Sequence, residues 1–472
     1  MKNKNAIFTG LGLLAAAVAW GALLVTGWET EACWAGAIAV ICAVWWITEP
    51  IPIPATSLIP LALFPAFGVL TPTEVGASYG SPLILLLMGG FILSTAMEKS
   101  GAHRRVALTM VNLFGGSSSR RLVYGFMAAA ALLSMWISNT ATTLMLLPVA
   151  LAVIDRSDDP NLATPLLLGV AYAASVGGIG TPIGTPPNLI FREIYQQTTG
   201  NEVQFLTWMT WGIPVVLLLV PIIGIWLTRR LGHHGPCRRC PKWAHGAPTR
   251  SASLSSFRSP RCSGSPRGQP LGGWSTWLGV PGANDAGVAL MAVVAMFLIP
   301  NGEDDGRLLD WETAVKIPWG MLILFGGGIA IAQAFVQSGL SGALGELLSG
   351  ISTWHIVLVI GVICLTITFL TEMTSNTATT TLMMPILAAA AIAADIEPAL
   401  LMVPAAMSAS CAFMLPVATA PNTIMFSTGR FAIRTMAREG FILNLIGVVG
   451  CAATVAVTLL SLGRRSLVLA GA

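Results

Sequence analysis

The chain has 472 residues, of which 54% are hydrophobic and only 10% are charged, and its formal net charge at pH 7 is +4. So few ionisable side chains cannot solvate a soluble globule of this size, and a mean hydropathy of +0.75 excludes that class of protein. Because the apolar runs have the length of membrane-spanning helices, we expect an all-α, polytopic membrane protein. The small net charge gives no indication of a nucleic-acid partner.

Long apolar runs predict the transmembrane helices, because about 20 apolar residues are needed to cross a hydrocarbon core about 30 Å thick. In chain order the runs are 7–26, 32–47, 53–70, 122–137, 205–227, 286–299, 356–370, 400–415 and 441–462. With shorter and broken segments included, we expect roughly a dozen spans. The first run follows MKNKN and is too long for a signal peptide, so we predict a retained helix with its amino end in the cytoplasm.

The chain carries an internal duplication. The hexapeptide SNTATT begins at Ser138 and again at Ser375. Further motifs recur in the same order in both halves: MGG at 88–90 with FGG at 325–327, Pro148 with Pro385, and TPIGTPPN at 181–188 with LPVATAPN at 415–422. Such duplication is typical of secondary transporters. We therefore predict a first repeat over 1–231 and a second over 272–472, in inverted orientation if each holds an odd number of spans.

The segment between the repeats, 232–271, is basic and rich in Pro and Ser, and we predict a disordered cytoplasmic linker. A compensated frameshift in the gene is an alternative explanation of its abrupt composition. Its Cys237-x-x-Cys240 pair and Cys262 could bind zinc, although their spacing matches no common zinc finger. The other five cysteines lie in apolar runs, where we expect unpaired thiols: Cys33, Cys42, Cys364, Cys411 and Cys451.

The SNT and Thr-Pro motifs are polar breaks in apolar surroundings. Non-helical backbone survives at membrane depth only inside protein or beside a water-filled cavity. Ser, Asn and Thr favour helix starts, while Pro removes an amide donor and forces a break. The oxygens exposed at such a break suit a small cation, and the amide donors of the following helix start suit an anion. One such motif can be mere hydrogen-bonding glue between helices, but two matched copies indicate a binding site.

Charged residues are scarce near these breaks. Neither SNT region contains Arg or Lys, so a bound anion requires helix ends, hydroxyls and co-bound cations. Glu49 and Glu372 are functional candidates as intramembrane carboxylates, although each lies beside a break, where it can equally cap a helix start. The Gly-rich segments at 85–93 and 322–332 indicate close helix packing. No zinc-protease, nucleophile-elbow or Walker motif is present, which argues against an enzyme and for secondary transport.

Three longer motifs accompany the SNT pair: WWITEPIPIPATSLIPLALFP at 45–65, GGIGTPIGTPPNLIF at 177–191 and FMLPVATAPNTIMF at 413–426. Together they resemble the divalent anion/sodium symporter family, which includes sodium-coupled dicarboxylate, citrate and sulfate carriers. The resemblance covers nearly the whole chain outside 232–271. It implies a homodimer of inverted repeats, with about 11 transmembrane helices, two re-entrant helical hairpins and an elevator-type transport domain.

The resemblance also implies the site residues. Substrate contacts fall on Ser138, Asn139, Thr140, Thr185, Pro186, Ser375, Asn376, Thr377, Thr419 and Ala420. The first sodium site falls on Ser134, Ser138, Asn139 and Gly184, and the second on Thr371, Thr374, Asn376 and Ala418. Ala420 stands where many relatives have proline, a change that bears on which anion fits.

The function that the resemblance implies is sodium-coupled symport of C4-dicarboxylates such as succinate, fumarate and malate across the inner, cytoplasmic membrane. Alternatives are a carrier of citrate, sulfate or another divalent anion, and a sodium-independent anion exchanger. A sodium/proton or oxyanion exporter would use different chemistry and would depend on Glu49 or Glu372. A membrane scaffold or receptor would move no substrate at all.

Overall fold

The computed structural model describes residues 2–99, 118–155, 157, 159–231, 285–301, 306–343 and 355–470. Within these ranges the regular elements are helices, and the only β pairing is an isolated bridge between Pro300 and Arg307. Eight helical segments of the described chain are long and apolar enough to span a membrane. The all-α membrane architecture is therefore confirmed. The predicted linker at 232–271, with its three cysteines, lies outside the described residues.

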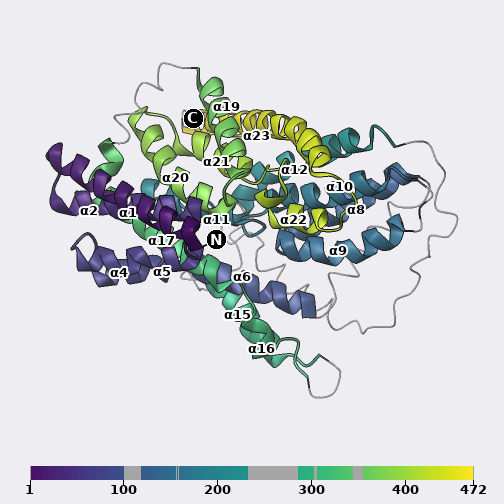
Figure 1. The fold of residues 1–472 in the computed structure, drawn as a ribbon, viewed down its shortest axis with the longest axis horizontal. Coiled ribbons are helices and arrows are strands. Elements are labelled where there is room, and N and C mark those ends of the chain that lie inside the picture. The colour runs from purple at the N-terminus through teal and green to yellow at the C-terminus, as the bar shows by residue number, and fades with distance from the viewer. Residues whose placement is uncertain are drawn as a thin grey trace.

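The helices fall into two series around the SNT motifs (Figure 1). The first series is α1 (Lys2–Val25), α2 (Thr30–Thr48), α3 (Ile53–Thr56), α4 (Ile59–Ala66), α5 (Pro72–Tyr79), α6 (Pro82–Lys99), α8 (Ser119–Ser134), α9 (Asn139–Ile154), α10 (Ala163–Gly177), η1 (Gly178–Gly180), α11 (Pro186–Thr199) and α12 (Phe205–Thr228). The second is α15 (Asp285–Leu298), α16 (Trp311–Ala314), α17 (Trp319–Gln337), α19 (Ile356–Thr371), α20 (Asn376–Ala393), α21 (Pro398–Ser408), η3 (Pro416–Ala418), α22 (Ala420–Phe426) and α23 (Ile433–Ala470).

The sequence had led us to expect a single helix from each long apolar run, but two of these runs are interrupted. The run 53–70 breaks between α3 and α4, where Ser57 receives a hydrogen bond from Trp46 Nε1 at 3.0 Å and donates one to the Ile53 carbonyl at 2.8 Å. Pro60 in the first turn of α4 also has no amide hydrogen to continue the helix. The run 400–415 leaves the helix after Ser408, because its later backbone groups bond to side chains instead.

Each SNT motif forms the turn of a helix–turn–helix unit. In the first unit α8 ends at Ser134 and α9 begins at Asn139. In the second, α19 ends at Thr371 and α20 begins at Asn376. Both α8 and α19 have 16 residues, which at 1.5 Å per residue gives about 24 Å, less than the thickness of the hydrocarbon core.

The two series interlock. Helix α11 of the first packs on α20 and α21 of the second, and α22 of the second packs on α9 and α10 of the first. The Tyr172 hydroxyl on α10 donates a 2.7 Å hydrogen bond to the Phe413 carbonyl between α21 and η3. Figure 1 shows α1, α2, α4 and α5 at one end of the long axis and α8, α9 and α10 at the other. Neither half therefore has a core of its own around its SNT motif.

The Gly-rich segments serve close packing, as predicted. A Cβ atom at Gly327 of α17 would lie 2.8 Å from the Ser57 carbonyl oxygen, and one at Gly326 would overlap the Tyr79 ring. In α6, a Cβ atom at Gly89 would lie 2.9 Å from Ala289 of α15. The five cysteines in the described residues are free and buried, which agrees with the expectation for thiols in apolar helices.

We expect Gly177→Ala to destabilise the protein. A Cβ atom there would lie 2.8 Å from the carbonyl carbon of Ala131 on α8 and would overlap its oxygen, and neither backbone can move away freely. Overpacking of this kind costs about 1–3 kcal/mol. Thermal unfolding in detergent should show a lower midpoint than that of Gly361→Ala, whose new methyl meets no atom within 4 Å. Equal midpoints for the two variants would contradict the close approach of α8 and α10.

Candidate functional site

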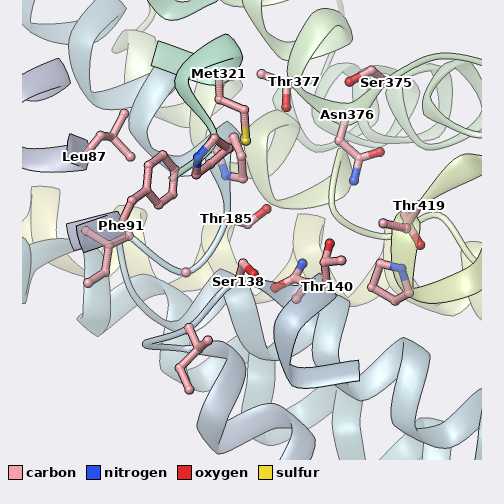
Figure 2. A pocket seen from close by; sticks show the side chains of 18 of the residues that line it. Leu87, Phe91, Ser138, Thr140, Thr185, Met321, Ser375, Asn376, Thr377 and Thr419 are labelled. Atoms are coloured by element: carbon pink, nitrogen blue, oxygen red, sulfur yellow. The ribbon is translucent and has the colours of Figure 1, made fainter. Parts of the chain in front are cut away.

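A cavity of about 520 Å³ lies where the two SNT turns meet the two Thr-Pro-Asn breaks. All ten residues predicted to contact substrate line it, from both halves of the chain: Ser138, Asn139, Thr140, Thr185, Pro186, Ser375, Asn376, Thr377, Thr419 and Ala420. Figure 2 shows hydroxyl and amide groups of both motifs around this space, opposite the apolar side chains of Leu87, Phe91 and Met321. The structure thus brings the predicted substrate residues together.

Four helices begin at this cavity. Their N-cap residues are Ser138 for α9, Thr185 for α11, Ser375 for α20 and Thr419 for α22. Ser138 accepts a hydrogen bond from the Ala141 amide at 3.2 Å, and Thr419 accepts one from the Asn422 amide at 3.3 Å. The first turns of α9 and α20 leave further amide donors, whereas α11 begins with Pro186 and Pro187, which have none. The helix dipole places partial positive charge at each start. The geometry favours an anion.

The first predicted sodium set is also assembled. Ser138, Asn139 and Gly184 line the cavity, whereas Ser134 is fully buried and donates a short hydrogen bond to Asn139 Oδ1. A Cβ atom at Gly178 would lie 2.9 Å from Asn139 Oδ1 and 3.0 Å from the Gly184 carbonyl oxygen, so both oxygens flank the same glycine. Hydroxyl, amide and carbonyl oxygens are the hard ligands that a small cation prefers.

The second predicted set repeats this arrangement. Thr371 is fully buried and donates a 2.5 Å hydrogen bond to Asn376 Oδ1, as Ser134 does to Asn139. Thr374, Asn376 and Ala418 line the cavity. The Thr374 hydroxyl donates to the Leu370 carbonyl at 2.9 Å and lies 2.5 Å from the Thr379 hydroxyl. The Thr374 hydroxyl is thus already engaged within the protein.

The asparagine side chain of each Thr-Pro-Asn motif binds backbone carbonyls of the adjacent break. Asn188 Nδ2 donates to the carbonyls of Gly178 at 3.0 Å and Thr181 at 2.8 Å. Asn422 Nδ2 donates to the carbonyls of Ala412 and Leu415 at 3.0 and 3.1 Å. Both side chains are fully buried. The duplicated motif pointed to these asparagines, but their role as braces becomes evident only from the structure.

Glu372 supports the second break and does not line the cavity. Its Oε1 accepts hydrogen bonds from the Met414 amide at 2.8 Å and Asn444 Nδ2 at 2.7 Å, and its Oε2 accepts one from the Leu415 amide at 2.9 Å. The residue is 3% exposed. The sequence allowed Glu372 to be either a functional carboxylate or a helix cap. Its contacts favour a structural role similar to that of a cap, because the two backbone amides that it binds directly precede η3.

In the wall opposite the SNT turns, the sequence identified Glu49 alone as a candidate. This wall consists of Glu49 at the end of α2, residues of α6, and residues at and before the start of α17: Leu87, Gly90, Phe91, Ser94, Pro318 and Met321. Trp136, Met373 and Val417 add apolar surface. Gly90 has open space beside it, unlike Gly89, so the Gly-rich segment of α6 serves both packing and the cavity. No Lys, Arg or His is among the described residues that line this space.

Comparisons with known proteins show the relatives of this chain. A family model described as citrate transporter matches residues 43–403. The sodium-dependent dicarboxylate transporter SdcS of Staphylococcus saprophyticus is 42% identical over an alignment of 452 positions, which covers 88% of this chain and 83% of that protein. SdcS of Staphylococcus aureus strain MRSA252 is 39% identical over 482 positions, which cover 95% of this chain and 91% of that protein.

A solved structure has a similar fold. The YdaH transporter of Alcanivorax borkumensis superimposes with a TM-score of 0.56 over 84% of this chain and 88% of its own, at 15% sequence identity. At this identity the likeness concerns the fold alone.

We expect Glu372→Ala to lower the unfolding midpoint more than Glu372→Gln. Alanine leaves two backbone amides and the Asn444 amide without their acceptor, at about 1–3 kcal/mol for each buried group. Glutamine keeps one acceptor oxygen but turns an NH₂ group toward another donor, so it should lie between alanine and the native residue. Thermal unfolding of the three purified proteins checks the order. A glutamine variant as stable as the native protein but devoid of transport would argue instead for a carboxylate that carries protons.

Proposed function

We propose that this chain, which belongs to the citrate transporter family, couples sodium entry to the uptake of C4-dicarboxylates such as succinate, fumarate and malate. It is a multi-pass membrane protein, and we place it in the inner, cytoplasmic membrane. The names of relatives at about 40% identity support sodium and dicarboxylate as cargo. We assign it no enzymatic activity.

One observation carries the proposal: the two SNT turns and four helix starts converge on one cavity whose described lining has no basic residue. Each long helix contributes about half a positive charge at its start. Helices α9, α11 and α20 together therefore do not neutralise a dianion beside the carboxylate of Glu49. Bound cations must supply the remaining charge, and this makes cation coupling a physical requirement, while the names of the relatives point to sodium as the cation.

We assign the oxygen sets around Asn139 and Asn376 to one sodium ion each. In both sets the asparagine lines the cavity while a buried hydroxyl lies behind it, from Ser134 or Thr371. The anion would lie between Ser138–Thr140 and Ser375–Thr377, with one carboxylate at each turn. Two sodium ions with one dianion are electroneutral, and each further cation would add about 2.3 kcal/mol of driving force per 100 mV.

The finer architecture is also a proposal. The helices α8 and α19 are too short to span a bilayer, which supports re-entrant hairpins with the SNT motifs at their tips. Matching contacts at Asn188 and Asn422 support a structural repeat over 1–231 and 272–472, and we propose that the two copies are inverted. We propose about 11 transmembrane helices, an elevator-type movement of the hairpin-bearing helices and a homodimer, as the family resemblance implies.

Citrate is the second candidate substrate, because the matching family model is described as citrate transporter. Ala420 lies in the cavity wall next to Thr419 and lacks the ring that a proline would place there. A wider wall at this point would admit a larger anion. The names of the relatives at about 40% identity nevertheless favour dicarboxylates.

Asn139→Ala and Asn376→Ala should each remove at least about nine-tenths of the transport, because each deletes a cation ligand and a carboxylate contact within one turn. Uptake by the purified variants in proteoliposomes measures the loss. Asn161→Ala changes the same residue type at an exposed position between α9 and α10 and should leave uptake unchanged. Full uptake by both cavity variants would overturn the site assignment.

Uptake of radiolabelled succinate into proteoliposomes tests the function itself. We expect accumulation under an inward sodium gradient, none under potassium, and competition by unlabelled fumarate and malate. Stronger competition by citrate than by fumarate would move the assignment to the second candidate. The absence of flux under either cation would reject the symporter.

A further inference from the structure

Glu49 has an unusual position. It ends α2 in the left-handed conformation, with φ 46° and ψ 49°, and its amide donates to the Trp45 carbonyl at 2.9 Å. Only one other non-glycine residue of the described chain, Asp395, has a positive φ, while five glycines do. A glycine would adopt this conformation at no steric cost, whereas a glutamate adopts it at a cost. This cost indicates that the side chain of Glu49 has a function at this position.

The side chain lines the cavity. Glu49 is exposed to this space, and its carboxylate makes no hydrogen bond or ion pair with the residues that the structure describes. It is the single ionisable residue among those lining the cavity. It also differs from Glu372, which is buried and fully engaged by three donors. Within the described part of the chain, no basic side chain is thus paired with it.

The carboxylate of Glu49 is opposite in sign to the partial positive charge at the helix starts. The SNT turns and the starts of α9 and α20 present amide donors to an anion, whereas Glu49 comes from α2 on the wall that α6 and α17 share. A fixed negative charge repels an incoming anion and attracts small cations into the same cavity. With cations bound, the loaded site is close to neutral and the repulsion largely disappears.

We propose that Glu49 is the residue that enforces coupling: it excludes an anion that arrives without its cations and so suppresses sodium-independent flux. The inference rests on the proposed function and adds a specificity-determining residue outside the SNT and Thr-Pro-Asn motifs. Its role is to weaken binding of the bare anion, which differs from the role of every other polar group on the cavity wall.

Glu49→Asn and Glu49→Asp form a matched pair. Asparagine and aspartate both tolerate the left-handed conformation better than most residues and have nearly the same size, so the two variants differ chiefly in charge. We expect Glu49→Asn to raise succinate uptake under potassium alone by about tenfold, the scale of one removed charge within several ångströms. Sodium-driven uptake should stay within about twofold of the native rate, and Glu49→Asp should behave as the native protein in both conditions.

The outcomes separate this inference from the proposed function. If the native protein shows no sodium-driven uptake, the function fails. The inference is then tested by binding, through the thermal stabilisation that succinate, citrate or sulfate gives each variant in potassium buffer. Stabilisation of Glu49→Asn but not of Glu49→Asp supports the charge filter. Equal sodium-free uptake and binding in the two variants would overturn it, and so would loss of sodium-driven uptake in Glu49→Asn alone, which would make Glu49 a cation ligand.

Discussion

Every backbone group in the two interrupted helices needs a partner, because neither lipid nor an apolar core supplies one. Asn188 and Asn422 meet this need, because each donates to two carbonyls within its own break. These braces hold the breaks open at a fixed shape. The cavity, the helix starts around it and the carbonyl of Gly184 beside Asn139 all depend on that shape.

The two repeats use different side chains to bind the backbone groups of their breaks. At the first break, Trp208 Nε1 donates to the Ile179 carbonyl at 2.9 Å, and Thr181 donates to the Met135 carbonyl. At the second, Glu372 and Asn444 bind the amides of residues 413–415. One break is thus held by neutral donors and the other by a carboxylate. The two halves share a plan, but they are not electrostatically equivalent.

The polar part of the site could be predicted from the sequence, and the apolar part could not. Ser138 and Ser375 stand out because a polar motif duplicated within apolar runs has few purposes other than a site. Leu87, Phe91 and Met321 carry no such signal, since an apolar residue that lines a cavity looks the same as one that faces lipid. The interruption at Ser57 was not predicted, and the sequence left the role of Glu372 open between two alternatives, because both depend on contacts with other segments.

The interlocking of the two series has a consequence for biosynthesis. The Tyr172 hydroxyl lacks its acceptor until Phe413 has been made, and the packing surfaces of α9 and α11 stay uncovered until α22 and α20 emerge from the ribosome. A nascent chain that has completed only its first half therefore has its first break braced internally, but the helices around that break still lack the partners of the second half. Such an intermediate needs protection by the insertion machinery, and the fold is completed only after the second half has been translated.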